Sequence, residues 1–289
     1  MAKILILGSG PAGVSAALYA VRGGVETTVI NQGIGALAKA EHIENYYGFA
    51  DAVSGQELAE AGISGAKRLG VQFVEAEVIG LGLNETLTGF QVQTTDSQFE
   101  ADSVVLATGA ARRQPKLPGL KELEGRGVSY CAVCDAFFYR GKEAAVLGGG
   151  EYALHEADTL LPHAAKVHVF TDGSTPEVDF PAAMTLHTEK ITAIQGEKRV
   201  QGVELAGGKI VPVAGVFVAY GTAGSGELAR KAGAILQENS IAVDRAMATN
   251  IPGLFAAGDC TGGLLQVAKA VYEGAVAGLS AVKYVRRSH

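Results

Sequence analysis

Residues 3–13 read KILILGSGPAG and decide the fold. The apolar run at 3–7 ends in a glycine turn, a helical pattern follows, and a second apolar run covers 27–30. This order predicts a strand–turn–helix–strand unit with the G-x-G-x-x-G fingerprint in its expected context. Glycines at these positions let the backbone approach a pyrophosphate at the positive end of a helix. The stretch therefore predicts a Rossmann-type dinucleotide site.

The same pattern returns at Gly148, 140 residues after Gly8. An apolar run at 144–147 leads into three consecutive glycines, and Ala153 replaces the third glycine of the fingerprint. The second strand of this unit is expected at 167–170. The repeat predicts an α/β fold with two Rossmann-like dinucleotide-binding domains in one chain.

The segments outside the two repeats predict that the second domain is inserted into the first. Residues 112–119, RRQPKLPG, contain two prolines and a glycine and are typical of a linker. A strand expected at 216–219 ends in a break at Tyr220-Gly221. The expected boundaries give residues 1–112 and 220–289 to the first domain and residues 113–219 to the second.

Charge and hydropathy restrict the class of partner. The chain has 289 residues, a net charge of −6 and a pI near 5.6, which disfavours binding to nucleic acid or to an anionic membrane surface. No apolar run reaches the roughly 18 residues of a membrane span, and the N-terminal run turns into glycine too early for a signal peptide. We expect a cytoplasmic protein that binds neither nucleic acid nor membrane.

Two of the three cysteines form one C-x-x-C pair, Cys131 and Cys134, and Cys260 stands alone. In a reducing compartment such a pair is more often catalytic or metal-binding than a structural crosslink. Structural zinc usually takes its four ligands from two such half-sites, and the sequence has no second C-x-x-C. We therefore expect a redox pair and no metal, and we expect Cys260 to be a buried structural residue.

Four motifs together resemble the low-molecular-weight thioredoxin reductases. They are GSGPAG at 8–13, ATG at 107–109, CAVCDAFFYRGK at 131–142 and AAGD at 256–259. The resemblance runs in order through nearly the whole chain. It implies FAD on the first domain, a redox disulfide on the second, thioredoxin as the protein substrate, and a homodimer with contacts between FAD domains.

The resemblance also implies which residues bind FAD. Asp259 matches the family aspartate that holds the ribityl chain, and Gln266 and Val267 match residues at the flavin ring. Asn31 stands where an acidic residue often takes a ribose hydroxyl, and an amide can bind that hydroxyl too. The expected FAD-binding residues are Gly8, Ser9, Gly10, Pro11, Ala12, Gly13, Asn31, Ala36, Leu37, Asn45, Val78, Ala107, Thr108, Gly109, Gly258, Asp259, Gln266, Val267 and Tyr272. For Tyr272 a dimer-interface or core position is an equal alternative to stacking on the flavin.

By the same resemblance, Cys134 faces the flavin and Cys131 attacks the disulfide of thioredoxin. A nearby oxidised flavin or a helix N-terminus would lower the pKa of the thiol and make the thiolate available. Asp135 fits a catalytic role in proton handling, because thiol–disulfide exchange must protonate a leaving thiolate. A helix N-cap is the alternative for Asp135.

The second glycine turn departs from the family pattern. Glu151 and Tyr152 follow the three glycines, so a carboxylate and a bulky ring are expected where a pyrophosphate would lie. Two like charges about 4 Å apart cost a few kcal/mol at an effective dielectric near 20. The strand after the turn is followed by Thr171-Asp172-Gly173, without the basic residues that hold the 2′-phosphate of NADPH in this family. We expect no NADPH binding, while Asp172 leaves NADH open through a ribose hydroxyl.

This loss resembles the ferredoxin-dependent flavin thioredoxin reductases, which keep FAD and the cysteine pair without a pyridine-nucleotide site. The resemblance implies reduced ferredoxin as the electron donor. Ferredoxins are generally acidic, so docking requires a basic patch on this protein. The candidate residues are Arg112, Arg113, Lys116, Lys121 and Arg126. The alternative for these residues is that they belong to a solvated linker without a binding role. Three other functions stay open: an NAD(P)H-dependent thioredoxin reductase, a diflavin-linked disulfide oxidoreductase and a non-catalytic flavin redox sensor.

Overall fold

The structure is a computed structural model that describes residues 2–109, 115–130, 132–220, 224–237 and 240–288, without the side chains of Lys39, Val133 and Cys134. Cys131 and the linker residues Arg112 and Arg113 lie outside the described residues. The chain divides into two compact units, residues 1–112 with 224–289, and residues 113–223. The second unit ends at residue 223, whereas the expected boundary is residue 219. Tyr220 still belongs to the second unit, since it lines a cavity there.

A parallel five-stranded sheet forms the centre of the first unit. Its strand order is β18 (Leu254–Ala256), β7 (Ser103–Leu106), β1 (Lys3–Leu7), β2 (Glu26–Asn31) and β3 (Gln72–Glu75). Residues 4–7 of β1 have no exposed surface. A parallel sheet that is covered on both faces requires such continuous apolar strands, which explains the run KILIL.

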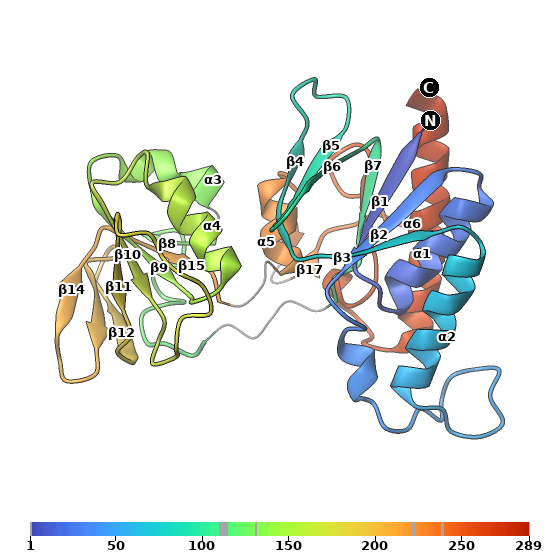
Figure 1. Ribbon diagram of the computed structural model, residues 1–289, viewed down its shortest axis with the longest axis horizontal. Helices are drawn as coiled ribbons and strands as arrows, with labels where there is room; N and C mark the ends of the chain where they lie inside the picture. The colour runs from blue at the N-terminus through green and yellow to red at the C-terminus, as the bar shows by residue number, and fades with distance from the viewer. Residues whose placement is uncertain (1, 110–114, 131, 221–223, 238–239, 289) are drawn as a thin grey trace. The chain divides into compact units, whose positions relative to one another are not determined.

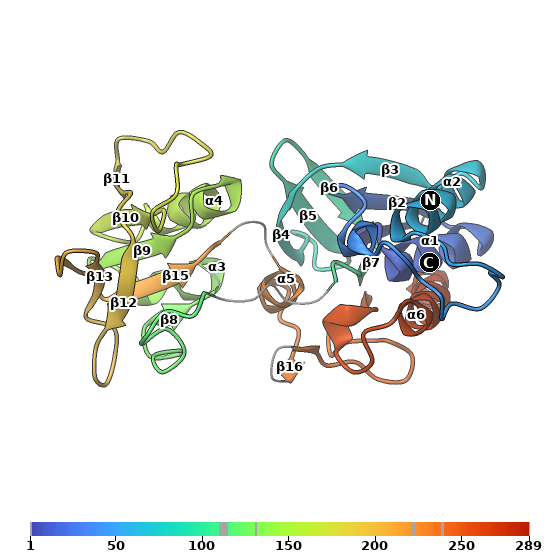
Figure 2. The same cartoon turned by 90° about the horizontal axis from the view of Figure 1, so that it is seen from below.

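Helices and a small antiparallel sheet cover the two faces of this central sheet. Figures 1 and 2 show α1 (Pro11–Arg22), α2 (Gly55–Arg68) and α6 (Val267–Ser288) on one face. The antiparallel strands β4 (Val78–Leu83), β5 (Phe90–Thr94) and β6 (Gln98–Ala101) lie on the other. The shorter elements of this unit are η1 (Ala36–Lys39), α5 (Ser225–Lys231), β16 (Leu236–Gln237), β17 (Ser240–Ile241) and η3 (Asp259–Thr261).

The second unit repeats the architecture on a smaller scale. Its parallel sheet has the order β11 (Met184–His187), β10 (Lys166–Phe170), β9 (Glu143–Leu147), β15 (Gly215–Val218) and β8 (Val128–Ser129). The helical elements are α3 (Ala132–Asp135), η2 (Ala136–Tyr139) and α4 (Glu151–Leu160), and α3 and α4 lie on the same side of the sheet (Figure 1). An antiparallel sheet of β12 (Ile191–Gln195), β13 (Gly202–Leu205) and β14 (Ile210–Pro212) completes the unit.

Each glycine turn joins two neighbouring parallel strands through a helix, as the repeat predicts. Leu7 of β1 pairs with Ile30 of β2, and Leu147 of β9 pairs with Phe170 of β10. The structure confirms the α/β fold with two Rossmann-like domains. Within the described part of the chain, no helix combines the length and apolar character needed to span a membrane.

Candidate functional site

The first glycine turn has the backbone shape that a dinucleotide requires. Gly8 has φ of +109°, and a Cβ atom there would lie 2.3 Å from the carbonyl oxygen of Ala107. A Cβ atom at Gly13 would lie 1.9 Å from the carbonyl oxygen of Gly8. Only glycine therefore fits these two positions without moving the backbone.

The N-terminus of α1 is open to an anion. Gly10 is its N-cap residue, no side chain caps it, and apart from its chain neighbours no described residue lies within 4 Å of a Cβ built there. Pro11 starts the helix, and the Ser9 hydroxyl is turned to the carbonyl oxygen of Gly33, to which it donates at 2.9 Å. The first N–H groups and the positive end of the helix dipole are thus available to a pyrophosphate. This geometry fits a dinucleotide such as FAD.

Parallel strands bring other expected residues to the edge that carries the glycine turn. Asn31 ends β2, Ala107 follows β7, and Gly258 comes shortly after β18. The carboxyl ends of parallel strands meet at one edge, where open α/β sheets bind their ligands. A Cβ atom built at Gly258 would lie 2.8 Å from the Cβ of Ala12, so the late AAGD motif packs against the start of α1.

Hydrogen bonds join two further pairs of expected residues. Asn45 Nδ2 donates to Gln266 Oε1 at 3.0 Å and so links the loop after η1 to the residue before α6. The hydroxyls of Thr108 and Ser225 lie 2.7 Å apart, and Ser225 donates to the carbonyl oxygen of Gly109 at 2.7 Å. Ser225 was not expected at the site, because it lies far from the ATG motif in sequence.

The remaining expected residues lie in or open short elements of the first unit: Ala36 and Leu37 in η1, Val78 at the start of β4, Asp259 at the start of η3 and Val267 at the start of α6. Tyr272 is 64% exposed on α6, so it is not a core residue. The flavin and dimer-interface alternatives for Tyr272 stay open.

An ion pair that was not predicted holds the loop of Asp259. Lys269 Nζ lies 3.1 Å from Glu273 Oε2, and the two side chains are 15% and 12% exposed. Lys269 also donates to the carbonyl oxygen of Gly258 at 2.8 Å, and Glu273 accepts the N–H of Gly258 at 2.8 Å. The Thr261 hydroxyl contacts both charged groups. The pair therefore ties the loop to α6, and its i,i+4 spacing was a signal visible in the sequence.

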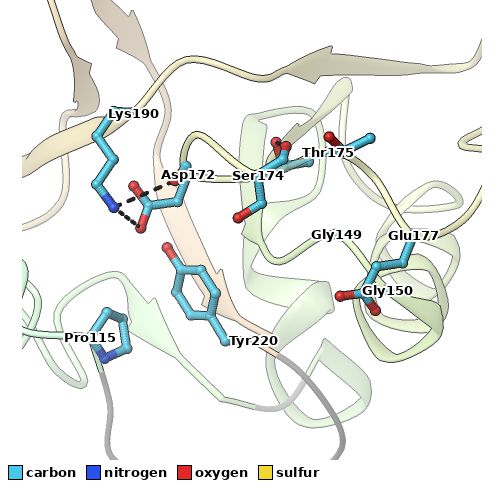
Figure 3. Close-up of a pocket in the computed structure, with 10 residues that line it drawn as sticks. Pro115, Gly149, Gly150, Asp172, Ser174, Thr175, Glu177, Lys190 and Tyr220 are labelled. Atoms are coloured by element: carbon cyan, nitrogen blue, oxygen red, sulfur yellow. Dashed lines mark hydrogen bonds and ion pairs between the residues drawn. The ribbon is translucent and has the colours of Figure 1, made fainter.

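In the second unit, a carboxylate of the protein itself lies at the glycine turn. Gly150 is the N-cap of α4, and no side chain caps it. Glu177 Oε2 lies 2.8 Å from a Cβ built at Gly150, and the N–H of Glu177 donates to the carbonyl oxygen of Gly149 at 2.8 Å. Figure 3 shows these residues around a cavity of about 360 Å³. A pyrophosphate bound at this helix end would meet the carboxylate of Glu177.

The carboxylate of Asp172, directly after β10, already has hydrogen-bond partners within the protein. It accepts the N–H of Ile191 at 2.9 Å and pairs with Lys190 Nζ at 3.0 Å (Figure 3). Both oxygens that could hold a ribose hydroxyl therefore already have donors. Tyr220 lines the same cavity, and burial together with the charge of Asp172 raises the pKa of its hydroxyl.

Tyr152 does not obstruct a cofactor path, contrary to the expectation. It is 1% exposed, and its hydroxyl lies 3.4 Å from the carbonyl oxygen of Tyr130. Helical periodicity turns Tyr152 into the core of the unit, while Glu151 is exposed in the first turn of α4. The acidic groups at this helix end are thus Glu151 and Glu177, of which only the first was expected.

The cysteine motif lies at the start of α3. Cys131 is outside the described residues, and Cys134 lies within the helix. The Asp135 carboxylate accepts the hydroxyl of Ser129 at 2.7 Å and makes no capping hydrogen bond to the turn that follows it. This contact disfavours the N-cap alternative for Asp135. No cluster of three His, Cys, Asp or Glu residues in the described ranges could hold a metal ion.

Cys260 is a buried thiol within the first unit. It is 2% exposed, and its Sγ contacts the carbonyl oxygens of Leu106 at 3.5 Å and Ala257 at 3.3 Å. Burial raises the pKa of this thiol to about 12. A thiol in this environment stays protonated and unreactive at neutral pH, as expected for a structural cysteine.

Comparisons with known proteins agree with this geometry. A model of the family "Pyridine nucleotide-disulphide oxidoreductase" matches residues 2–274. The thioredoxin reductase of Listeria innocua is 34% identical over 98% of this chain and 93% of its own length. That of Aquifex aeolicus is 35% identical over 89% and 84%, respectively.

Two solved structures of similar proteins cover nearly the whole chain. The atypical thioredoxin reductase TRi from Desulfovibrio vulgaris Hildenborough has a TM-score of 0.93 and 35% identity, with 99% of both chains covered. A ferredoxin-flavin thioredoxin reductase from Clostridium acetobutylicum has a TM-score of 0.73 and 33% identity, with 99% of this chain and 98% of that chain covered. The chain belongs to the thioredoxin reductases within the pyridine nucleotide-disulphide oxidoreductase family, and it is an FAD-binding oxidoreductase that acts on a disulfide.

Proposed function

We propose that this protein reduces thioredoxin with electrons from reduced ferredoxin, through FAD and the Cys131–Cys134 pair. The observation that carries the choice of donor is the carboxylate of Glu177 at the second glycine turn, where a nicotinamide dinucleotide would place its pyrophosphate. The relatives named thioredoxin reductase support the substrate, and the ferredoxin-flavin enzyme of Clostridium acetobutylicum supports the donor.

Electrostatics explains why this turn disfavours a nicotinamide dinucleotide. Glu177 and Glu151 bring two carboxylates to the end of α4 that would bind a diphosphate. Each like-charge contact at about 4 Å costs from about 1 kcal/mol in water to about 4 kcal/mol near a protein surface. Residues 171–175, TDGST, supply no cation for a 2′-phosphate. Lys190, a cation that lines the same cavity, is paired with Asp172 at 3.0 Å. NADPH therefore loses its diphosphate anchor and meets an already paired cation near the expected 2′-phosphate position.

The energetics allow ferredoxin as the donor. Plant-type ferredoxins have potentials of about −400 mV and thioredoxin about −270 mV. Two electrons that fall by roughly 130 mV release about 6 kcal/mol. FAD, when bound, can take up single electrons from an iron–sulfur cluster and deliver an electron pair to a disulfide.

The chain's own residues carry the thiol chemistry. In the reduced pair, the Cys131 thiolate attacks the disulfide of thioredoxin, a mixed disulfide forms, and one thioredoxin sulfur leaves as a thiolate. Asp135 lies next to this pair in sequence and passes the proton of the Cys134 thiol to this leaving thiolate, and the second thioredoxin sulfur takes its proton from water when it is released. Cys134 then attacks the mixed disulfide and releases thioredoxin with two thiols, which restores the Cys131–Cys134 disulfide. Two electrons and two protons pass to thioredoxin in each cycle.

Exposed aromatic rings follow the cysteine helix directly. Phe137 and Phe138 in η2 are 63% and 67% exposed, and the guanidinium of Arg140 lies 5.1 Å from the ring of Phe137. The two rings lie edge to face with 6.5 Å between their centroids, and contiguous exposed apolar patches often mark protein-binding sites. They form a suitable contact surface for a protein substrate beside the redox pair.

Basic residues for ferredoxin are present on the second unit. Lys116, Lys121 and Arg126 are exposed, as an acidic partner requires, and Arg126 also donates to the backbone carbonyl of Glu122. We further propose a cytoplasmic homodimer and domain limits near residues 112 and 219–223. Exposed Tyr272 and Leu279 on α6 are candidates for the dimer contact.

A direct rate comparison tests the proposed donor. Three reactions each contain the holoenzyme and oxidised thioredoxin. They differ in the electron donor, which is electrochemically reduced plant-type ferredoxin, NADPH or NADH, supplied at equal electron equivalents. We expect the ferredoxin-supported rate of thiol formation to exceed either nicotinamide rate by at least about 100-fold, a difference of about 2.7 kcal/mol in activation free energy. Equal or faster turnover with NADPH would contradict the proposed donor.

The Lys269–Glu273 pair is expected to control FAD binding. In Lys269→Met, the partly buried Glu273 loses its partner, and leaving one charge of a buried pair typically costs about 3–5 kcal/mol. Because the pair ties the Asp259 loop to α6, we expect FAD affinity to fall by at least about tenfold, or about 1.4 kcal/mol. Titration of the apoprotein with FAD, followed by flavin fluorescence, measures this.

The matched control for this prediction is Lys283→Met, which removes an exposed lysine from the same helix. It should leave FAD affinity unchanged. Equal affinity in the Lys269→Met and wild-type proteins would mean that the ion pair does not position the FAD-binding loop.

A further inference from the structure

Two histidines and a glutamate form a hydrogen-bonded chain within the second unit. Glu143 Oε2 lies 2.8 Å from Nε2 of His168, and Nδ1 of His168 lies 2.9 Å from Nε2 of His187. The two histidines are 3% and 9% exposed, whereas the side chain of Glu143 is 49% exposed. His187 also stacks on Phe170, with 4.5 Å between the ring centroids. The thiol chemistry proposed above uses none of these residues.

The geometry limits how many protons the two rings can hold. An ionised carboxylate only accepts hydrogen bonds, so Nε2 of His168 carries the hydrogen that it donates to Glu143. Two nitrogens 2.9 Å apart share one hydrogen, so His168 Nδ1 and His187 Nε2 cannot both be protonated. The folded pair therefore contains at most one imidazolium. In the unfolded chain both rings become charged below about pH 6.5, the ordinary pKa of histidine.

The surroundings of His187 oppose its protonation as well. Burial, and after it the charge of His168, lowers the pKa of His187. Lys209 and Lys166 act in the same direction, and Glu189 acts against them. Glu189 also lies 3.7 Å from Lys209 Nζ, so its own charge is partly compensated. Because the folded form binds fewer protons than the unfolded form, stability is lost as the pH falls below about 6.5.

The histidine pair joins the edge strand β11 to β10, beside the loop that carries Glu177. Among the described strands, β11 pairs only with β10, so a single backbone ladder holds it. The carbonyl oxygen of His187 accepts the N–H of Thr171 at 3.0 Å, at the start of the loop 171–183. Further along this loop, the N–H of Glu177 donates to the carbonyl oxygen of Gly149 at 2.8 Å. Losing the contact between the two rings would therefore loosen both β11 and the loop.

We propose that His168 and His187 form an acid-sensitive contact that holds β11 and the loop 171–183 in place. When the pair takes up a second proton from solvent, an N–H faces an N–H, and the hydrogen bond between the rings breaks. The strand and the loop then open more often. The inference goes beyond the proposed function, since it involves neither FAD nor the cysteine pair.

Hydrogen–deuterium exchange followed by mass spectrometry tests this inference. The holoenzyme is exchanged at about pH 7.5 and about pH 5.5, one unit on either side of the ordinary histidine pKa. Protection of peptides from residues 171–187 is corrected for the intrinsic exchange rate at each pH. We expect it to fall about tenfold at the lower pH, because opening then takes up about one proton. Peptides from β1 report any general loss of structure.

His187→Gln is the decisive variant. Its amide N–H can still donate to His168 Nδ1, but the amide does not titrate. Protection of residues 171–187 should therefore differ by less than about twofold between the two pH values. His42→Gln is the matched control, because His42 is an exposed histidine of the first unit, and it should keep the tenfold loss. An equal loss in His187→Gln and wild type would overturn the inference.

If His187→Gln does not fold, the wild-type protein decides. Nitrogen NMR of holoenzyme with isotope-labelled histidine reports the protonation of each ring. We expect at most one imidazolium in the pair while residues 171–187 stay protected. Two imidazolium rings with unchanged protection, or no loss of protection at the lower pH, would overturn the inference. No electron donor enters these experiments, so flavin reduction by NADPH would count against the proposed function alone.

Discussion

Cys131→Ser is expected to abolish thioredoxin reduction while FAD stays bound. A serine hydroxyl is not ionised at neutral pH and cannot form the mixed disulfide, so turnover should fall by at least about 1,000-fold. The residues that fit FAD all belong to the unit of residues 1–112 and 224–289, whereas the cysteine pair belongs to the other unit. Flavin absorbance should therefore remain at the wild-type level. The measurement is thioredoxin thiol formation per bound flavin.

Cys260→Ala is the control for this variant. It removes the remaining cysteine, which is buried and whose thiol pKa is raised to about 12. We expect its turnover to stay within about twofold of wild type, since a protonated buried thiol takes no part in exchange. Substantial turnover in Cys131→Ser would show that electrons reach thioredoxin without the cysteine relay.

Restoring NADPH binding is the second large expected effect. Glu151→Gly and Glu177→Gly remove both carboxylates from the end of α4, and Ser174→Arg and Thr175→Arg add cations at exposed positions that line the cavity. If charge is the barrier, the Kd for NADPH should fall by about 100-fold, or about 2.7 kcal/mol. Titration calorimetry of the four-residue variant and the wild type measures the gain.

The structure dictates where these cations are placed. Thr171 is buried, and Asp172 holds Lys190 and the backbone of Ile191, so an arginine at either position would disturb the unit itself. Glu197→Gln, at an exposed site outside the cavity, is the control for removing a carboxylate from this unit away from the glycine turn. If the four-residue variant binds NADPH no better than this control, the shape of the second unit excludes NADPH and charge does not.

The two Rossmann units were predictable because their signals are local. Within each unit, the glycine turn and its two apolar runs lie in a stretch of about 30 residues, as in any βαβ unit. Gly8 is a clear case, since a side chain there would meet Ala107, the first residue of the ATG motif. The glycine is thus required both by the turn and by the close approach of the chain that follows β7.

The contacts that distinguish this protein were harder to predict because they depend on loop paths. Glu177 reaches Gly150 only because the chain after β10 returns to the glycine turn, and no local pattern specifies that return. Tyr152 was misplaced because its neighbour in sequence is the glycine turn, while the helix turns it inward. The spacing of Tyr152 and Glu156 on one helix face was the available signal.

Anaerobic reduction of the bound flavin tests the proposed donor most directly. The absorbance of the holoenzyme at about 450 nm, where oxidised flavin absorbs, is followed while NADPH, NADH and then reduced ferredoxin are added. We expect both nicotinamides to leave the absorbance unchanged over minutes and stoichiometric reduced ferredoxin to bleach it. Rapid bleaching by NADPH would contradict the assignment of Glu151 and Glu177 as the groups that exclude a nicotinamide donor.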